Sequence, residues 1–118
     1  MPKVLIVDDS LFMRNHLARL LGEHGYETVL AENGREAVKM YRSVRPDVVL
    51  MDITMPQMNG MDALAEIRQL DLRARVVMLT ALDQQLVAAR AVHMGAKDFL
   101  VKPVTSARLL LAVQKALK

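Results

Sequence analysis

The sequence predicts a doubly wound α/β fold, in which five βα units build a five-stranded parallel sheet with helices on both faces. Short apolar runs recur at intervals of about twenty residues, and the segments between them have the apolar periodicity of helices. The runs contain no alternating polar residues, which is typical of strands that are buried on both sides. Together these observations favour a parallel sheet over an antiparallel one.

The predicted strands are not equal in polarity. The second is more polar than the others, as a position at the edge of the sheet allows. The first and third are continuous apolar runs that stop abruptly at aspartates. We expect the five strands over residues 3–7, 27–31, 48–51, 75–79 and 98–101.

Four of the five predicted helices follow a side chain suited to an N-cap. The second helix should run to about Arg42, and the fourth, over residues 84–94, should end at Gly95. The third helix follows the turn-rich loop 53–60 and has no cap assigned from the sequence. The expected capping residues are Ser10, Asn33, Asp83 and Thr105.

The composition limits the class of protein. Of the 118 residues 53% are hydrophobic and 25% charged, which fits one packed domain and excludes intrinsic disorder and fibrous repeats. The absence of cysteine excludes disulfides, thiolate zinc sites and cysteine nucleophiles. The apolar runs are too short to cross a membrane, and the basic residues are scattered rather than striped. We therefore expect a cytoplasmic protein that binds neither a membrane nor nucleic acid directly.

Polar residues end four of the predicted strands. In open parallel sheets the ligand crevice lies beyond the carboxyl ends of the strands, so these residues should meet at one edge. They are Asp8 and Asp9 after the first strand, Asp52 after the third, Thr80 after the fourth and Lys102 after the fifth.

This set of residues suggests phosphoryl chemistry. Clustered carboxylates repel one another, and a hard divalent cation relieves that repulsion, with Mg²⁺ the best fit and Mn²⁺ an alternative. Asp52 is the candidate nucleophile, because a carboxylate can attack phosphorus to give an acyl phosphate. Lys102 can neutralise the incoming phosphoryl group, and Thr80 can donate a hydrogen bond to it.

Several separate motifs resemble one family. They are Val-Asp-Asp near the N-terminus, Met-Asp-Ile-Thr-Met-Pro-Gln-Met-Asn-Gly in the middle, Thr-Ala after the fourth strand and Val-Lys-Pro after the fifth. The sequence resembles the receiver domain of two-component response regulators over essentially its whole length, and within that family it is most similar to the single-domain chemotaxis regulators. The resemblance implies one receiver domain over residues 1–118, with a flavodoxin-like (βα)5 sandwich and strand order 2-1-3-4-5.

The resemblance also implies roles for individual residues. It places the phosphoacceptor at Asp52 and a magnesium ion on Asp8, Asp9, Asp52 and the backbone carbonyl of Thr54. Lys102 would pair with the phosphoryl group, and its bond to Pro103 would be cis. In the family a threonine and an aromatic residue move together on activation, and Thr80 and Phe99 occupy these positions.

The partners implied by the resemblance are a histidine kinase as phosphodonor, an effector such as the flagellar motor switch, and a phosphatase. The chain would be mainly a signalling switch that catalyses its own phosphotransfer and autodephosphorylation. The fourth predicted helix is unusually apolar, and in the family the surface that it forms with the fifth strand and helix often binds partners. The residues expected on this surface are Leu86, Val87, Phe99 and Val101.

Two alternatives stay open at this point. The chain can be a receiver excised from a longer regulator with a DNA-binding output domain. It can also be a magnesium-dependent phosphohydrolase that uses Asp52 as its nucleophile. Such enzymes usually place a second acid two residues after the nucleophile, where this chain has Thr54, and they need a substrate pocket that 118 residues scarcely supply.

Overall fold

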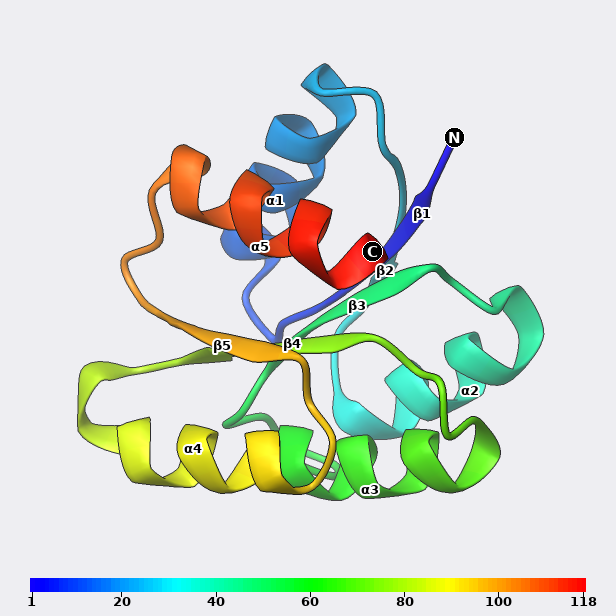
Figure 1. Ribbon diagram of the computed structural model, residues 1–118, viewed down its shortest axis with the longest axis vertical. Helices are drawn as coiled ribbons and strands as arrows, with labels where there is room; N and C mark the ends of the chain where they lie inside the picture. The colour runs from blue at the N-terminus through cyan, green and yellow to red at the C-terminus, as the bar shows by residue number, and fades with distance from the viewer.

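The computed structural model describes residues 1–118 and contains one five-stranded parallel sheet in the order β2-β1-β3-β4-β5 (Figure 1). This confirms the predicted fold class and strand order. β2 lies at an edge, as its polarity predicted. The strands are β1 (Lys3–Val7), β2 (Glu27–Ala31), β3 (Val48–Asp52), β4 (Val76–Thr80) and β5 (Asp98–Val101).

The helices form two layers, one on each face of the sheet. In Figure 1, α1 and α5 cover one face, and α2, α3 and α4 cover the other. None of the helices has the length and apolar character that crossing a bilayer would need. The helices are α1 (Leu11–Glu23), α2 (Gly34–Val44), α3 (Gly60–Leu70), α4 (Gln85–His93) and α5 (Ser106–Leu117), with a 3₁₀ turn, η1 (Leu82–Gln84), before α4.

The central strands are buried on both faces because their side chains alternate between two cores. In β3, Val48 and Leu50 belong to the cluster under α1 and α5, whereas Val49 and Met51 belong to the cluster under α2, α3 and α4. Every residue of β3 and β4 is buried. This double burial explains the uninterrupted apolar runs in the sequence.

Three of the four expected caps form as predicted. The side chains of Ser10, Asn33 and Thr105 accept hydrogen bonds from backbone N–H groups in the first turns of α1, α2 and α5. The expectation for Asp83 is wrong. This residue lies inside the 3₁₀ turn η1, so its backbone cannot take the cap position, and α4 starts without a side-chain cap.

Some boundaries also differ from the prediction by one or two residues. α2 continues to Val44, and Arg45 ends it in the left-handed conformation with a φ of 51°. β4 runs from Val76 to Thr80, one residue later than expected. Thr80 thus belongs to the strand itself, which fixes its backbone in the sheet.

Two glycines let helix N-termini pack closely against the loop that follows β3. Gly34 and Gly60 are the first residues of α2 and α3. A Cβ at Gly34 would collide with the carbonyl oxygen of Met58, and one at Gly60 would collide with that of Asp52. The Gly60 N–H also donates to the Ile53 carbonyl at 2.7 Å. The start of α3 therefore packs against the backbone of Asp52 and is hydrogen-bonded to the next residue, Ile53.

Candidate functional site

Three aspartates come together at the carboxyl ends of β1 and β3. Val7 pairs with Met51 in the sheet, so the residues that follow, Asp8 and Asp52, become neighbours. Carboxylate oxygens of Asp8, Asp9 and Asp52 lie within 4.8 Å of one another. Asp8 and Asp52 are buried, whereas Asp9 is exposed. The strand-end aspartates predicted from the sequence are thus in one cluster.

Lys102 reaches this cluster from the end of β5. Its Nζ lies 3.1 Å from Asp8 Oδ2 and 3.3 Å from Asp52 Oδ1. The backbone N–H of Lys102 donates to the Thr80 carbonyl at 2.8 Å, which fixes where the side chain starts. The next peptide bond, Lys102–Pro103, is cis. One ammonium group therefore bridges the two buried carboxylates.

The electrostatics of the cluster disfavour the charged form of Asp52. Burial raises the pKa of Asp52 from 3.8 to about 6; the charge of Lys102 opposes this rise, and those of Asp8 and Asp9 add to it. Burial alone would lower the pKa of Lys102, but the attraction of Asp52 and Asp8 outweighs it and raises that pKa. Lys102 is therefore firmly charged, and burial rather than the neighbouring acids accounts for the raised pKa of Asp52.

The donor set fits a hard divalent cation. Three carboxylates supply oxygen ligands, and burial makes the charged form of Asp52 unfavourable, so a bound cation would stabilise that form. Thr54 lies two residues beyond Asp52, in the loop between β3 and α3. Its hydroxyl donates to Oε1 of Gln84 at 2.9 Å, which links this loop to η1.

Thr80 and Phe99 lie on the two neighbouring strands β4 and β5. Thr80 is fully buried, and its hydroxyl donates at 3.1 Å to the carbonyl of Ala81, the residue that follows the strand. Phe99 pairs with Met78 in the sheet and packs against the core under α4. In this structure, therefore, the Thr80 hydroxyl is bonded to the backbone of the next residue.

The residues expected on a partner surface lie on α4 and β5. Leu86 is 88% exposed. Val87, Phe99 and Val101 are half-buried. The expected surface thus contains one fully solvated apolar side chain and three partly covered ones.

Two residues that contact the site were not predicted from the sequence. One lies in the loop between β1 and α1, and the other lies in α1. The Ser10 N–H donates to Asp8 Oδ1 at 2.9 Å, in addition to the cap that its hydroxyl forms. Nη1 of Arg14 donates to the Asp8 carbonyl at 2.8 Å. In the sequence Arg14 is one of several basic residues, and nothing there connects it with the aspartates.

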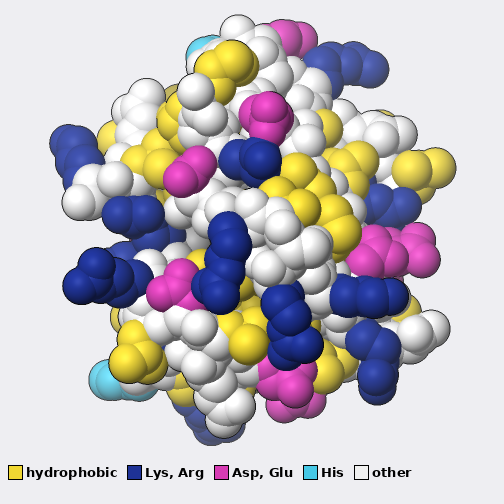
Figure 2. All heavy atoms as spheres, turned by 90° about the vertical axis from the view of Figure 1, so that its right-hand side faces the viewer, with side chains coloured by type: hydrophobic (Ala, Val, Ile, Leu, Met, Phe, Trp, Pro, Cys, Tyr) yellow, Lys and Arg dark blue, Asp and Glu magenta, His cyan; other side chains and the backbone are white.

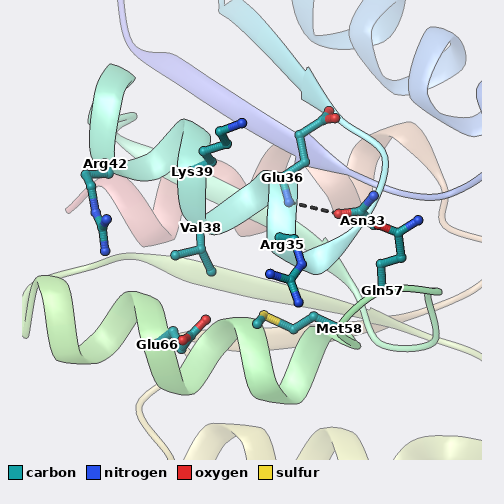
Figure 3. A pocket seen from close by; sticks show the side chains of 9 residues that line it. All are labelled: Asn33, Arg35, Glu36, Val38, Lys39, Arg42, Gln57, Met58 and Glu66. Atoms are coloured by element: carbon teal, nitrogen blue, oxygen red, sulfur yellow. Dashed lines mark hydrogen bonds between the residues drawn. The ribbon is translucent and has the colours of Figure 1, made fainter.

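A separate groove lies between α2 and α3 (Figure 3). It has a volume of about 530 Å³, and Arg35, Arg42 and Glu66 project into it from the two helices. It contains none of the strand-end residues. On the face that includes α2, Lys and Arg side chains are interspersed with acidic and apolar ones (Figure 2), which agrees with the scattered basic residues of the sequence.

Comparison with known proteins identifies the family. The response regulator receiver domain family matches residues 4–114. The chain belongs to this family. The receiver domain is 49% identical, over the full length of both chains, to the chemotaxis protein CheY of Listeria monocytogenes. The aspartate cluster therefore occurs in a two-component response regulator.

Solved structures agree with this assignment. A response regulator receiver domain protein from Clostridium thermocellum superposes on the receiver with a TM-score of 0.96 at 31% identity, covering 99% of this chain and 94% of that one. A chain of the CheX–CheY–BeF3–Mg²⁺ complex from Borrelia burgdorferi gives a TM-score of 0.93 at 37% identity, covering 98% of this chain and 89% of that one.

Proposed function

We propose that this chain, residues 1–118, is a phosphorylation-activated receiver of a two-component chemotaxis system, with Asp52 as the phosphoacceptor. The observation that carries the proposal is the position of the Asp52 carboxylate, which lies 3.3 Å from Lys102 and within the cluster formed with Asp8 and Asp9. Full-length similarity to CheY proteins supports the chemotaxis assignment.

In the proposed reaction Asp52 takes the phosphoryl group from a phosphohistidine of a kinase. A carboxylate oxygen of Asp52 forms a bond to phosphorus, the phosphorus–nitrogen bond breaks, and its electron pair returns to the imidazole. Lys102 is already within ion-pair distance of Asp52, so its ammonium can neutralise the incoming phosphoryl oxygens without a large movement.

The proposed cofactor is Mg²⁺, held by Asp8, Asp9, Asp52 and the backbone carbonyl of Thr54. When bound, it supplies positive charge that offsets the phosphoryl oxygens. The geometry of the aspartates supports this assignment, since three carboxylates with oxygens within 4.8 Å of one another offer the oxygen ligands that Mg²⁺ prefers.

The proposed switch begins at Thr80. Its hydroxyl is bonded to the Ala81 carbonyl, and turning it toward a phosphoryl oxygen would give up that bond for a charge-assisted one. Phe99 on the adjacent strand would respond to this movement. The surface around Leu86, Val87, Phe99 and Val101 would then bind the effector, such as the flagellar motor switch.

The test is intact mass spectrometry after incubation with acetyl phosphate and Mg²⁺. We expect the wild-type chain to gain the mass of one phosphoryl group, and we expect a chelator to abolish the gain. Asp52→Asn should gain nothing, whereas the control Asp83→Asn, which changes an exposed carboxylate, should behave as wild type. Labelling that persists in Asp52→Asn would contradict the assignment of the phosphoacceptor.

A further inference from the structure

We propose that Arg14 is a positioning residue for the cation site: its guanidinium holds the backbone carbonyl of Asp8, next to Asp9, and so presents the Asp9 carboxylate to Asp8 and Asp52. The inference rests on the magnesium site of the proposed function. Arg14 lies in the first turns of α1 and touches none of the reacting groups itself.

The first contact is on the N-terminal side of Asp9. At the end of β1 the pairing of the sheet stops, so the carbonyl of Asp8 needs a donor from elsewhere. Nη1 of Arg14 supplies it at 2.8 Å. The Arg14 side chain is only 12% exposed, so this charge-assisted bond is largely shielded from water.

The second contact is on the C-terminal side. The backbone N–H of Arg14 donates to the Ser10 carbonyl at 3.0 Å, as the first helical bond of α1. Any residue except proline would make this backbone bond, so on this side Asp9 is held by the start of α1, and the contact that belongs to the Arg14 side chain is the one to the Asp8 carbonyl. Since Asp9 itself is exposed, its orientation depends on these flanking anchors.

The guanidinium also faces β2. Its Nη2 lies 3.9 Å from Oε2 of Glu32, a side chain that is 62% exposed. An ion pair with so exposed a partner contributes little. The bond to the Asp8 carbonyl is therefore the contact that matters, and Glu32 offers a control for it.

If Arg14 acts by positioning Asp9, its replacement should change the affinity for the cation in the opposite direction from the one that its charge alone predicts. The guanidinium is a positive charge bonded to the backbone of Asp8, so on charge alone its removal should tighten the binding of a cation. If Arg14 positions Asp9, its removal should weaken binding, because the loop must then be ordered when the cation binds. Outer-shell partners of this kind typically contribute roughly tenfold or more to metal affinity.

The experiment measures Mg²⁺ binding to the unphosphorylated protein by isothermal titration calorimetry. Arg14→Met keeps the apolar stem and should raise the Kd for Mg²⁺ about tenfold. Arg14→Lys keeps the charge without the planar fork and should also raise it. Arg19→Met, the same substitution at an exposed position of α1, and Glu32→Gln should leave the Kd unchanged.

A second measurement separates positioning from general damage to the fold. In metal-free protein the amides of Asp9 and Ser10 should exchange with solvent faster in Arg14→Met than in Arg19→Met, while the β3 amides exchange at the wild-type rate. Arg14→Lys serves as the test should Arg14→Met fail to fold.

The outcomes are distinct. Folded Arg14 variants that bind Mg²⁺ as tightly as wild type, or more tightly, overturn the role of Arg14 alone. A wild-type chain that binds no Mg²⁺ overturns the proposed cation site, and this inference with it.

Discussion

Replacing the proposed phosphoacceptor should make the metal-free protein more stable. The pKa of Asp52 rises from 3.8 to about 6 on folding, chiefly because the carboxyl is buried. At about 1.4 kcal/mol for each pKa unit, the charged form costs roughly 3 kcal/mol at neutral pH. Solvent reaches 12% of the Asp52 side chain and screens part of this cost. We therefore expect Asp52→Asn to raise the free energy of unfolding by about 2 kcal/mol.

The assay is urea unfolding of both proteins in chelator, followed by circular dichroism at several pH values. Because the folded pKa of Asp52 is raised, the folded state binds this proton more tightly than the unfolded state does. The cost is therefore absent below about pH 4, grows between about pH 4 and 6, and is complete above that range. The advantage of Asp52→Asn should follow the same course.

The control for this assay is Asp83→Asn, which changes an exposed carboxylate that caps no helix. It should leave the unfolding free energy within about 0.5 kcal/mol of wild type at every pH. Equal stability of Asp52→Asn and wild type at pH 7, or a difference that does not change with pH, would refute the reasoning from burial.

Three further predictions concern other parts of the molecule. Gly60→Ala should lower the free energy of unfolding by about 2 kcal/mol in urea and slow phosphorylation, because its Cβ would displace the Asp52 carbonyl. Tyr41→Phe should lower it by about 1 kcal/mol, since the hydroxyl donates to Asp71 at 2.8 Å. That bond lowers the pKa of Asp71, so the deficit should shrink as the pH falls through the lowered value. Leu86→Glu should leave unfolding within about 0.5 kcal/mol of wild type, because the side chain is 88% exposed, but should weaken effector binding in a pull-down with the phosphorylated chain.

The fold and the composition of the site could be predicted because both follow from one local rule. A strand buried on both faces must be apolar throughout, so its end is marked where the first polar residue appears. Asp8 and Lys102 mark such ends, and Asp52 and Thr80 are the last residues of their strands. Parallel pairing then brings these residues to one edge, whatever the details of packing.

Contacts that depend on three-dimensional approach could not be predicted in this way. The collision that a Cβ at Gly60 would cause arises because α3 lies against the Asp52 carbonyl, and no local pattern encodes that approach. The bond from Arg14 to the Asp8 carbonyl spans six residues and depends on the angle between β1 and α1. The prediction that Asp83 caps a helix was wrong because a 3₁₀ turn occupies the position where the cap would lie.

The contacts that the sequence did not predict act on the backbone around the aspartates. The residues that it did predict act through their charges. Lys102 offsets the buried carboxylates of Asp8 and Asp52, but it lies between them and cannot by itself fix where Asp9 points. A cluster that repels itself stays compact only if the chain on either side is anchored elsewhere. Gly60 provides that anchor behind Asp52, and Arg14 provides it at the Asp8 carbonyl, next to Asp9. Losing either anchor should therefore reduce phosphorylation even though every charged group of the site remains in the sequence.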